Sequence, residues 1–301
     1  MTKFPSPKNC PLCRSKNINP YWDRCWRRDD IEVYRCEKCT VLFLHPMMND
    51  SEADKYYLNY VSHLTARGVA PNETPEQTFI RRDKVGAYRI KIAKTIVKPG
   101  SNALEIGGGC GNFIGNMLKK GYMSSGALVE SCREHLEFAG NKFNLKCHSS
   151  LKNMDGEKFD AVFMLHVLEH IRNPEQFLRL CSSFLKKNGL FIVEVPCSAD
   201  PLLSLYKCDA FKNFYFQPMH HYTYSENSLK YIFGKAGYSP SKFIYHQRYS
   251  LLNHLNWITT GKPAGKQDFL GIFDDAIEKK YINNLTKNRL ADTIFGVFVK
   301  K

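Results

Sequence analysis

The stretch Asn102–Phe113 reads NALEIGGGCGNF, a short apolar strand pattern that leads into a run of glycines. Glycine is needed where a backbone must turn sharply and come close to a ligand. The dinucleotide fingerprint G-x-G-x-x-G is not met, because its third position falls on a residue other than glycine. The pattern that is present, E-x-G-x-G-x-G, consists of Glu105, Gly107, Gly109 and Gly111. We therefore expect a strand, a tight ligand-binding turn and a helix, in that order.

An acidic residue stands at the end of the next strand pattern. The segment GALVE, residues 126–130, ends in Glu130. From such a position a carboxylate can accept hydrogen bonds from both hydroxyls of a ribose. A glycine turn combined with this acid predicts a cofactor that contains a ribose and places no pyrophosphate at the turn. The alternative is a tight strand-to-helix turn that binds nothing.

Strand and helix patterns alternate from Ser101 onward, which predicts an α/β fold with a parallel sheet and crossover helices. The expected strands are residues 102–106, 126–130, 145–149, 159–165, 190–196, 242–249 and 292–300.

Two helix starts are marked by capping residues. Asn173–Pro174 is typical of an N-cap followed by the first helical residue, and this helix is expected to run as far as Gly189. Thr223 and Glu226 fit a capping box, which predicts a helix that ends at Gly237.

The composition divides the chain into three parts. Residues 1–47 are rich in cysteine and form the expected zinc-binding module. Residues 48–98 contain helix patterns around a turn-rich break and are interpreted as a helical lid or linker. Residues 99–301 form the expected α/β domain.

Two C-x-x-C knuckles lie near the N-terminus, Cys10 with Cys13 and Cys36 with Cys39. Four thiolates suit tetrahedral zinc and close its coordination shell, so no position is left for water or substrate. A closed site of this kind is structural, because metal binding supplies folding energy to a module that is too short to bury a sufficient core. The alternative is that the two C-x-x-C segments are turns that occur by chance and bind no metal.

The charge and cysteine content limit the partners and the location. The net charge of +14 favours nucleic acid, an anionic membrane surface or an anionic small substrate. The basic residues are scattered rather than gathered in one arm, which weakens the case for nucleic acid without removing it. A solvated basic surface is the commonest cause of such a charge. No apolar run is long enough for a membrane span. An odd count of eleven cysteines and an N-terminus without an apolar segment predict a cytoplasmic protein.

From about residue 85 onward the sequence resembles the class I methyltransferases that use S-adenosylmethionine. LEIGGGCGNF looks like their first motif, ALVES like the second, FDAVFMLHVLEHIRNPEQFL like the fourth and GLFIVEVPC like the strand after it. The resemblance implies a Rossmann-like sheet of seven strands in the order 3-2-1-4-5-7-6, with one antiparallel strand.

The resemblance also implies a set of cofactor-binding residues. They are Glu105, Gly107, Gly109, Gly111, Glu130, Ser149, Leu165 and His166. The first four would shape the pocket for the methionyl part, and Glu130 would hold the ribose. Ser149 would lie near adenine, where relatives often carry an acid. Leu165 and His166 would pass beside the methionyl end.

A narrower resemblance covers nearly the whole chain. A four-cysteine module, a methyltransferase domain and a histidine-containing loop look like the sugar and small-molecule methyltransferases of bacterial surface-polysaccharide and antibiotic pathways. This resemblance implies methylation of a sugar or nucleotide-linked sugar. The positive charge of the protein would then help to hold the phosphate groups of a nucleotide-linked sugar.

The segment His166–His170, HVLEH, matches the inverted zincin pattern H-x-x-E-H. A buried strand pattern precedes it, and Pro174 starts a new helix four residues after it, so no long zincin helix fits. We expect His166 to face the cofactor crevice, and Glu169 and His170 to shape the acceptor side. Glu194, near the end of the 190–196 strand, is either a substrate ligand or an exposed strand-end carboxylate.

The loop of residues 218–224 is the expected source of a general base, because it contains His220 and His221. In the sugar C-methyltransferases that it resembles, a histidine at the His221 position assists catalysis. A tyrosine lies three residues earlier in those enzymes, where this chain has Pro218. That difference favours O-methylation. The alternative is that both histidines only position substrate or cap the next helix.

Two other functions compete with this interpretation. A four-cysteine module also precedes some RNA base methyltransferases, but the chain lacks the Asn/Asp-Pro-Pro-aromatic tetrad of many of them and has Val195-Pro196-Cys197 at that strand end. A catalytically silent zinc-ribbon binding module is the other alternative, and the intact glycine loop and Glu130 argue against it.

Overall fold

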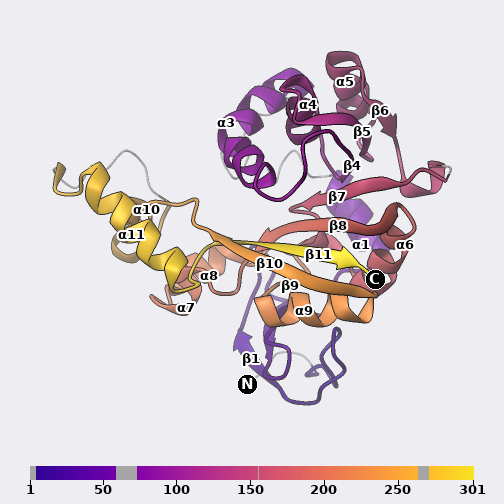
Figure 1. The fold of residues 1–301 in the computed structure, drawn as a ribbon. Coiled ribbons are helices and arrows are strands. Elements are labelled where there is room, and N and C mark those ends of the chain that lie inside the picture. The colour runs from indigo at the N-terminus through magenta and orange to yellow at the C-terminus, as the bar shows by residue number, and fades with distance from the viewer. Residues whose placement is uncertain (1–4, 59–72, 155, 264–270) are drawn as a thin grey trace.

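The computed structural model describes residues 5–58, 73–154, 156–263 and 271–301. Its centre is a seven-stranded sheet (Figure 1). In spatial order its strands are β10 (Tyr238–His246), β11 (Thr293–Lys300), β8 (Leu185–Pro196), β7 (Phe159–Leu165), β4 (Ser101–Ile106), β5 (Met123–Val129) and β6 (Lys146–His148). Counted from β4 this order is 6-7-5-4-1-2-3, and β11 runs antiparallel to both of its neighbours. The α/β fold and the strand order 3-2-1-4-5-7-6 are therefore confirmed.

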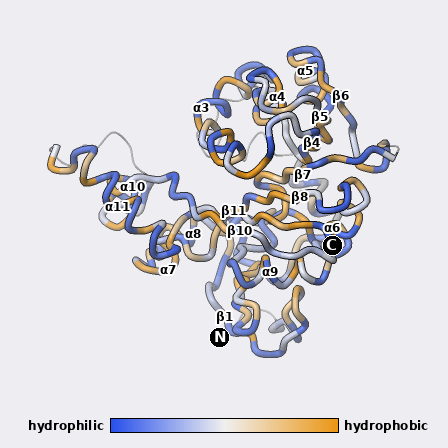
Figure 2. The backbone as a smooth tube through the Cα atoms, viewed as in Figure 1, coloured by the Kyte–Doolittle hydropathy of each residue, from blue (hydrophilic) through white to orange (hydrophobic). Residues whose placement is uncertain are grey.

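Both faces of the sheet are covered, as β7 shows. Val162 and Met164 point into one hydrophobic core, while Phe163 and Leu165 point into another on the opposite face. This alternation follows from the two-residue period of a strand. Hydrophobic residues accordingly mark β7, β8 and β11 in the middle of the molecule (Figure 2).

Helices fill the connections between the strands. They are α1 (Asp50–Leu58), α3 (Pro75–Ala93), α4 (Asn112–Lys119), α5 (Arg133–Phe143), α6 (Pro174–Ser182), α7 (Pro201–Ser204), α8 (Asp209–Tyr215), α9 (Glu226–Lys235), α10 (Leu251–Thr260) and α11 (Asp275–Lys287), with short 3₁₀ helices η1 (Leu151–Asn153) and η2 (Leu168–His170). Helix α4 packs on β4 and β5, and α9 packs on β10 and β11. Helices α10 and α11 extend away from the sheet (Figure 1). None of the helices in the described ranges combines the length and hydropathy that a membrane span needs.

A second sheet joins the N-terminal segment to the domain. It consists of β1 (Ile18–Trp22), β2 (Glu32–Cys36), β3 (Leu42–His45) and β9 (Tyr222–Thr223), in that order. The last strand comes from the domain, and it pairs Phe43 with Tyr222 and Leu42 with Thr223. The hydroxyl oxygens of Thr40 and Ser225 lie 2.6 Å apart beside this pair. The expected boundary at residue 47 is thus bridged by shared strand pairing.

Two local predictions are corrected. The helix that begins at Pro174 ends at Ser182, well before Gly189, and β8 starts at Leu185. Residues 186–189 form a bulge against β7 instead, because Asn188 has a φ of 60°. The bulge places Lys186 Nζ 2.8 Å from Asp160 Oδ1.

The second correction concerns the capping box before α9. Its N-cap is Ser225, whose hydroxyl accepts the N–H of Ser228 at 3.1 Å. The predicted cap, Thr223, belongs to β9 and is occupied by strand pairing. The expected lid or linker, residues 48–98, contains α1 and α3, while residues 59–72 within it lie outside the described residues.

Candidate active site

The glycine turn follows β4 with a left-handed backbone. Gly107, Gly109 and Gly111 have φ values of 72°, 57° and 73°, a region that residues with a Cβ rarely adopt. A Cβ on Gly107 would lie 2.5 Å from Cγ2 of Val167, so the close approach also requires glycine there. The turn therefore exposes backbone rather than side chains at the carboxyl end of the strand.

Glu130 follows β5 and already contacts the turn. Its Oε2 accepts the N–H of Gly109 at 2.8 Å, and its Oε1 accepts the N–H of Cys132 at 2.9 Å. The role of Glu130 toward a ribose stays a prediction.

Glu105 lies beneath the turn rather than in the open crevice. Its side chain is buried, and Oε2 accepts the N–H of Ile114 at 3.0 Å in the first turn of α4. Burial raises the pKa of this carboxyl to about 7, against the lowering effect of that hydrogen bond. Glu105 thus braces the turn from below.

Leu165 and Ser149 mark the ends of two further strands. Leu165 is the last residue of β7 and is buried. Ser149 follows β6, is exposed, and accepts a hydrogen bond of 2.7 Å from Nδ2 of Asn153. The predicted cofactor residues thus meet at the carboxyl edge of the sheet, where open α/β sheets bind ligands.

His166 directly follows β7 in a left-handed conformation, with a φ of 58°. Its Nδ1 lies 3.0 Å from Oε1 of Glu169, and its Nε2 lies 3.3 Å from Oε1 of Glu194. Burial lowers the pKa of His166, but the two carboxylates outweigh burial and raise it. His166 therefore bridges two buried acids, which favour its protonated form.

Glu194 is fully buried at the end of β8 and has three partners. Besides His166, it accepts a hydrogen bond from the hydroxyl of Tyr88, and Oε2 lies 2.6 Å from Nε of Arg89. Burial raises the pKa of Glu194, but the cations outweigh it and hold the pKa well below its usual range. Of the two interpretations of Glu194, the exposed strand-end carboxylate is wrong.

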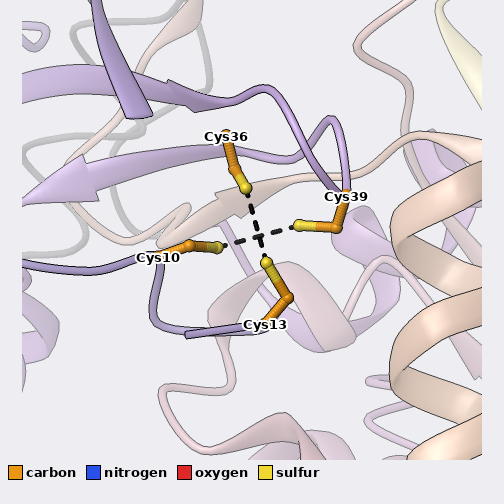
Figure 3. A group of neighbouring side chains, drawn as sticks. All are labelled: Cys10, Cys13, Cys36 and Cys39. Atoms are coloured by element: carbon orange, nitrogen blue, oxygen red, sulfur yellow. Dashed lines mark hydrogen bonds between the residues drawn. The ribbon is translucent and has the colours of Figure 1, made fainter. Parts of the chain in front are cut away.

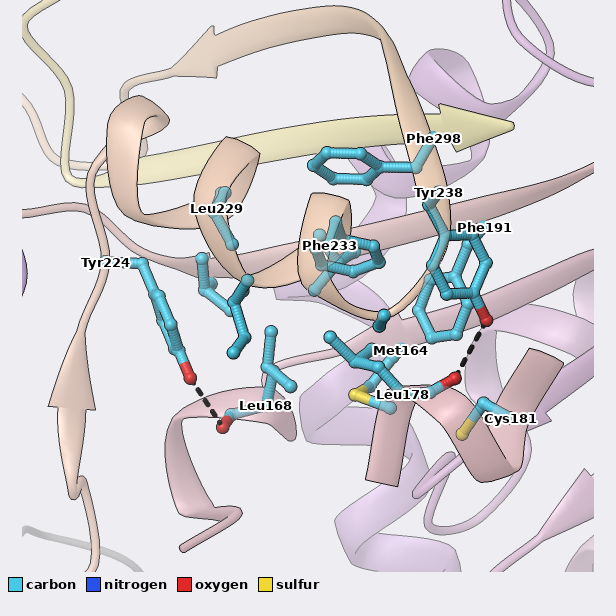
Figure 4. Close-up of a cluster of buried hydrophobic side chains, with 14 of the residues drawn as sticks. Met164, Leu168, Leu178, Cys181, Phe191, Tyr224, Leu229, Phe233, Tyr238 and Phe298 are labelled. Atoms are coloured by element: carbon cyan, nitrogen blue, oxygen red, sulfur yellow. Dashed lines mark hydrogen bonds between the residues drawn. The ribbon is translucent and has the colours of Figure 1, made fainter. Parts of the chain in front are cut away.

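Glu169, His170 and His220 come together next to His166, whose Nδ1 contacts Glu169. One ligand atom from each lies within 4.8 Å of the others. The rings of His170 and His220 have centroids 4.8 Å apart and stand nearly perpendicular. Tyr224 donates a hydrogen bond to the carbonyl of Leu168 and so fixes the start of η2 (Figure 4).

His221 is oriented differently from its neighbour. It is 3% exposed, and its carbonyl accepts the N–H of Leu44 at 3.0 Å next to the β3–β9 pair. Burial, with a smaller contribution from the charge of His170, lowers the pKa of its imidazole to about 4. Nδ1 of His221 has no hydrogen-bond partner among the described residues.

Comparison with known proteins identifies the domain that carries this crevice. A family model described as a methyltransferase domain matches residues 79–241, which is more than half of the chain. The chain belongs to the methyltransferase domain family.

The methyltransferase domain has relatives in several organisms. It is 24% identical over 112 residues to a ubiquinone biosynthesis O-methyltransferase of Coxiella burnetii, a match that covers 35% of this chain and 48% of that protein. A Glaesserella parasuis protein of the same name is 31% identical over 113 residues, covering 31% of this chain and 44% of that protein. The chain thus spans about half the length of these curated relatives.

A solved structure has the same fold as the methyltransferase domain. It is a SAM-dependent methyltransferase from Archaeoglobus fulgidus, with 21% sequence identity and a TM-score of 0.50. The match covers 72% of this chain and 94% of that one. At this identity the comparison shows the fold alone.

Helix α3 packs against the glycine turn of the methyltransferase domain. Nδ2 of Asn112 donates to the carbonyl of Phe79 at 2.8 Å, and Sγ of Cys110 donates to the carbonyl of Pro75 at 3.3 Å. A Cβ on Gly109 would lie 2.6 Å from Nη1 of Arg82. The helix therefore packs directly on the glycine turn, and its role as a lid stays a prediction.

The four predicted zinc ligands converge at the N-terminal end (Figure 3). Sγ of Cys10 lies 3.7 Å from that of Cys39, and Sγ of Cys13 lies 3.4 Å from that of Cys36. A tetrahedral ion with Zn–S bonds of about 2.3 Å separates its sulfurs by about 3.8 Å. All four cysteines are buried, and none is in a disulfide. The donor set and its spacing fit a closed zinc site.

The sequence interpretation missed the side chains that contact Glu194 and its neighbour His166. Tyr88 and Arg89 lie on α3, and Arg248 follows β10 with Nη1 3.4 Å from Nε2 of His166. A signal for one of them was present, because Arg82 and Arg89 are seven residues apart and so share a helical face toward the sheet. No local pattern marked Arg248.

Proposed function

We propose that this chain transfers the methyl group of S-adenosylmethionine to a hydroxyl oxygen of a small molecule. The acceptor we favour is a sugar or nucleotide-linked sugar of bacterial polysaccharide biosynthesis, methylated in the cytoplasm. One observation carries the proposal: the glycine turn with Glu130 follows β4 and β5, and the histidine–carboxylate group follows β7, the next strand in the sheet.

The donor side fits the proposed cofactor through its backbone. The turn around Gly107 has no room for a Cβ, and Glu130 holds two backbone N–H groups that ribose hydroxyls can replace. S-adenosylmethionine supplies a methyl group that its sulfonium sulfur already activates. The protein must therefore align the acceptor and exclude water.

On the acceptor side, a proton must leave the hydroxyl as its oxygen bonds to the methyl carbon. We propose His221 as the group that takes this proton. Its imidazole is neutral at pH 7, because its pKa is lowered to about 4, and its Nδ1 has no partner among the described residues. His170 and His220 are more accessible, so the acceptor approaches His221 past these two rings.

Two observations support an oxygen acceptor with negative charge. The relatives from Coxiella burnetii and Glaesserella parasuis are named O-methyltransferases, and Pro218 replaces the tyrosine of the sugar C-methyltransferases. The net charge of +14 favours a phosphate-bearing acceptor.

Calorimetry with S-adenosylmethionine followed by a transfer assay tests the proposal. Labelled cofactor is incubated with the protein and with nucleotide sugars, quinol-type phenols or RNA in parallel. We expect binding of one cofactor and label on a nucleotide sugar only. Label on the phenol or on RNA would reject the sugar, and no cofactor binding would reject methyl transfer altogether.

The variant His221→Ala tests the proposed base. Turnover should fall on the order of a hundredfold or more, because general-base catalysis contributes at least that much. His45→Ala, in β3 and outside the crevice, is the matched control. Cofactor affinity should be unchanged in both variants. A loss of turnover below about threefold would remove His221 from this role.

A further inference from the structure

Three side chains on the acceptor side have the composition of a metal site. Glu169 and His170 lie in η2, and His220 lies in the loop before β9. One carboxylate oxygen and two imidazole nitrogens lie within 4.8 Å of one another. This group is far along the chain from the four cysteines and shares no residue with them.

Glu169 has an oxygen that lacks a partner. Its Oε1 is held by Nδ1 of His166 at 3.0 Å, but Oε2 has no hydrogen-bond partner among the described residues, although the side chain is fully buried. A buried, unpaired carboxylate oxygen costs free energy unless a donor or a cation meets it. A cation between Glu169 and the two histidines supplies that partner.

His170 is oriented as metal-bound histidines are. Its Nδ1 lies 3.0 Å from the carbonyl oxygen of Met219, and a carbonyl can only accept. Nδ1 therefore carries a proton in this geometry, which leaves Nε2 as the ring atom that can bind an ion. Such a hydrogen bond from the second ring nitrogen to a carbonyl is the usual support of a ligand histidine.

We propose that Glu169, His170 and His220 bind a divalent transition-metal ion that holds the acceptor oxygen. Two imidazoles and one carboxylate favour Zn²⁺, Co²⁺, Mn²⁺ or Fe²⁺ over Mg²⁺ and Ca²⁺, which prefer oxygen ligands. Three protein ligands leave a coordination position open for substrate. This inference rests on the proposed function, because it assigns the acceptor hydroxyl to that open position.

The chemistry balances with the ion in place. A hydroxyl oxygen bound to the ion loses its proton more easily, and the proton passes to His221. The oxygen then forms its bond to the methyl carbon, while the bond between that carbon and sulfur breaks with its electron pair left on sulfur. His166 is not a ligand, because both of its nitrogens face the carboxylates of Glu169 and Glu194. The site therefore differs from an inverted zincin, which uses both histidines of H-x-x-E-H.

Titration with Co²⁺ of the full chain that holds one equivalent of zinc, in the cysteine site, tests the second site. Zinc prefers thiolates and keeps the cysteine site filled, so added Co²⁺ reports on a second site. We expect one equivalent of Co²⁺ by calorimetry, with visible absorption that lacks a thiolate-to-cobalt charge-transfer band. No uptake of Co²⁺, or uptake with that band, would overturn the proposal.

Substitution of each of the three proposed ligands tests whether that side chain binds the ion. Glu169→Gln, His170→Ala and the more accessible His220→Ala should each weaken Co²⁺ binding by at least about tenfold. The matched control is Glu157→Gln, which alters a carboxylate 3.9 Å from His148 and outside the cluster. Equal Co²⁺ affinity in the three variants and the control would overturn the assignment.

A separate measurement keeps this proposal apart from the proposed function. Cofactor binding and methyl transfer are followed in the same preparation. Methyl transfer without a second metal equivalent overturns the metal site alone. Co²⁺ binding that the three variants weaken supports the metal site even where S-adenosylmethionine does not bind, a result that rejects only the proposed function.

Discussion

The backbone N–H of Gly109 donates a hydrogen bond of 2.8 Å to Oε2 of Glu130, so the glycine turn after β4 and the acid after β5 form one unit. Oε1 of the same carboxylate accepts the N–H of Cys132 at 2.9 Å, so both of its oxygens are held by backbone. A ligand that replaces Gly109 at Oε2 meets a carboxylate that is already oriented.

Glu130→Ala should therefore weaken S-adenosylmethionine binding about 10- to 100-fold, since a hydrogen bond to a charged group contributes roughly 1.5–3 kcal/mol. Calorimetry measures the change. Glu134→Ala, in the first turn of α5, is the matched control and should bind the cofactor normally. Unchanged affinity in Glu130→Ala would exclude a ribose contact.

Gly107→Ala should destabilise the fold by about 2–4 kcal/mol, because it combines a left-handed φ with a clash against Val167. Gly100→Ala is the control, since Gly100 has a φ of 77° and no atom within 4 Å of a Cβ. It should cost only about 1–2 kcal/mol. Urea denaturation of both variants separates the strain from the clash, and Val167→Ala should partly rescue Gly107→Ala. Equal losses in the two glycine variants would contradict the clash.

Glu105 should make stability depend on pH. Its pKa is about 7 in the folded chain because of burial, against an ordinary value of 4.5. The folded chain then binds the proton more tightly, so this stabilisation is complete below about pH 4.5 and is lost as pH rises through 7. The loss amounts to roughly 3 kcal/mol.

Glu105→Gln keeps an acceptor for the N–H of Ile114 and removes the titration. Urea denaturation between about pH 5 and 8 should show wild type losing stability relative to this variant as pH rises. Parallel pH profiles would show that Glu105 does not titrate in this range.

Cys10→Ser combined with Cys36→Ser should abolish bound zinc, because each substitution removes a ligand from the four-thiolate group. Metal analysis of the purified protein measures the stoichiometry. Cys132→Ser is the control, since Cys132 is exposed and distant from that group. Stoichiometric zinc in the double variant would contradict the assignment.

Short sequence patterns predicted those parts of the site that are formed within one short segment of the chain. The turn at Gly107 and the strand Phe159–Leu165 could be recognised because a few neighbouring residues determine them. The partner of Glu194 could not, because Arg89 meets it from an element more than a hundred residues earlier in the chain. Such a contact depends on how helices pack across the sheet.

The adjacent residues His220 and His221 show the same limit of prediction from short sequence patterns. The sequence gives no reason to separate His220 from His221, yet His220 joins Glu169 and His170 while His221 is buried next to β9. The carbonyl of His221 accepts the N–H of Leu44 in β3, which holds His221 beside this strand. The pairing with β3 that causes this comes from the N-terminal segment, as does the displacement of the cap from Thr223 to Ser225.

The pairing of β3 with β9 has a consequence for how the specificity of this protein could change. Tyr222 and Thr223 are held by Phe43 and Leu42, and the loop that carries His220 ends at this pair. Substitutions at Leu42 or Phe43 can therefore reposition the histidine loop without touching any substrate. Acceptor preference can be retuned from a part of the chain that lies outside the crevice, and the N-terminal segment cannot be exchanged between relatives as an independent cassette.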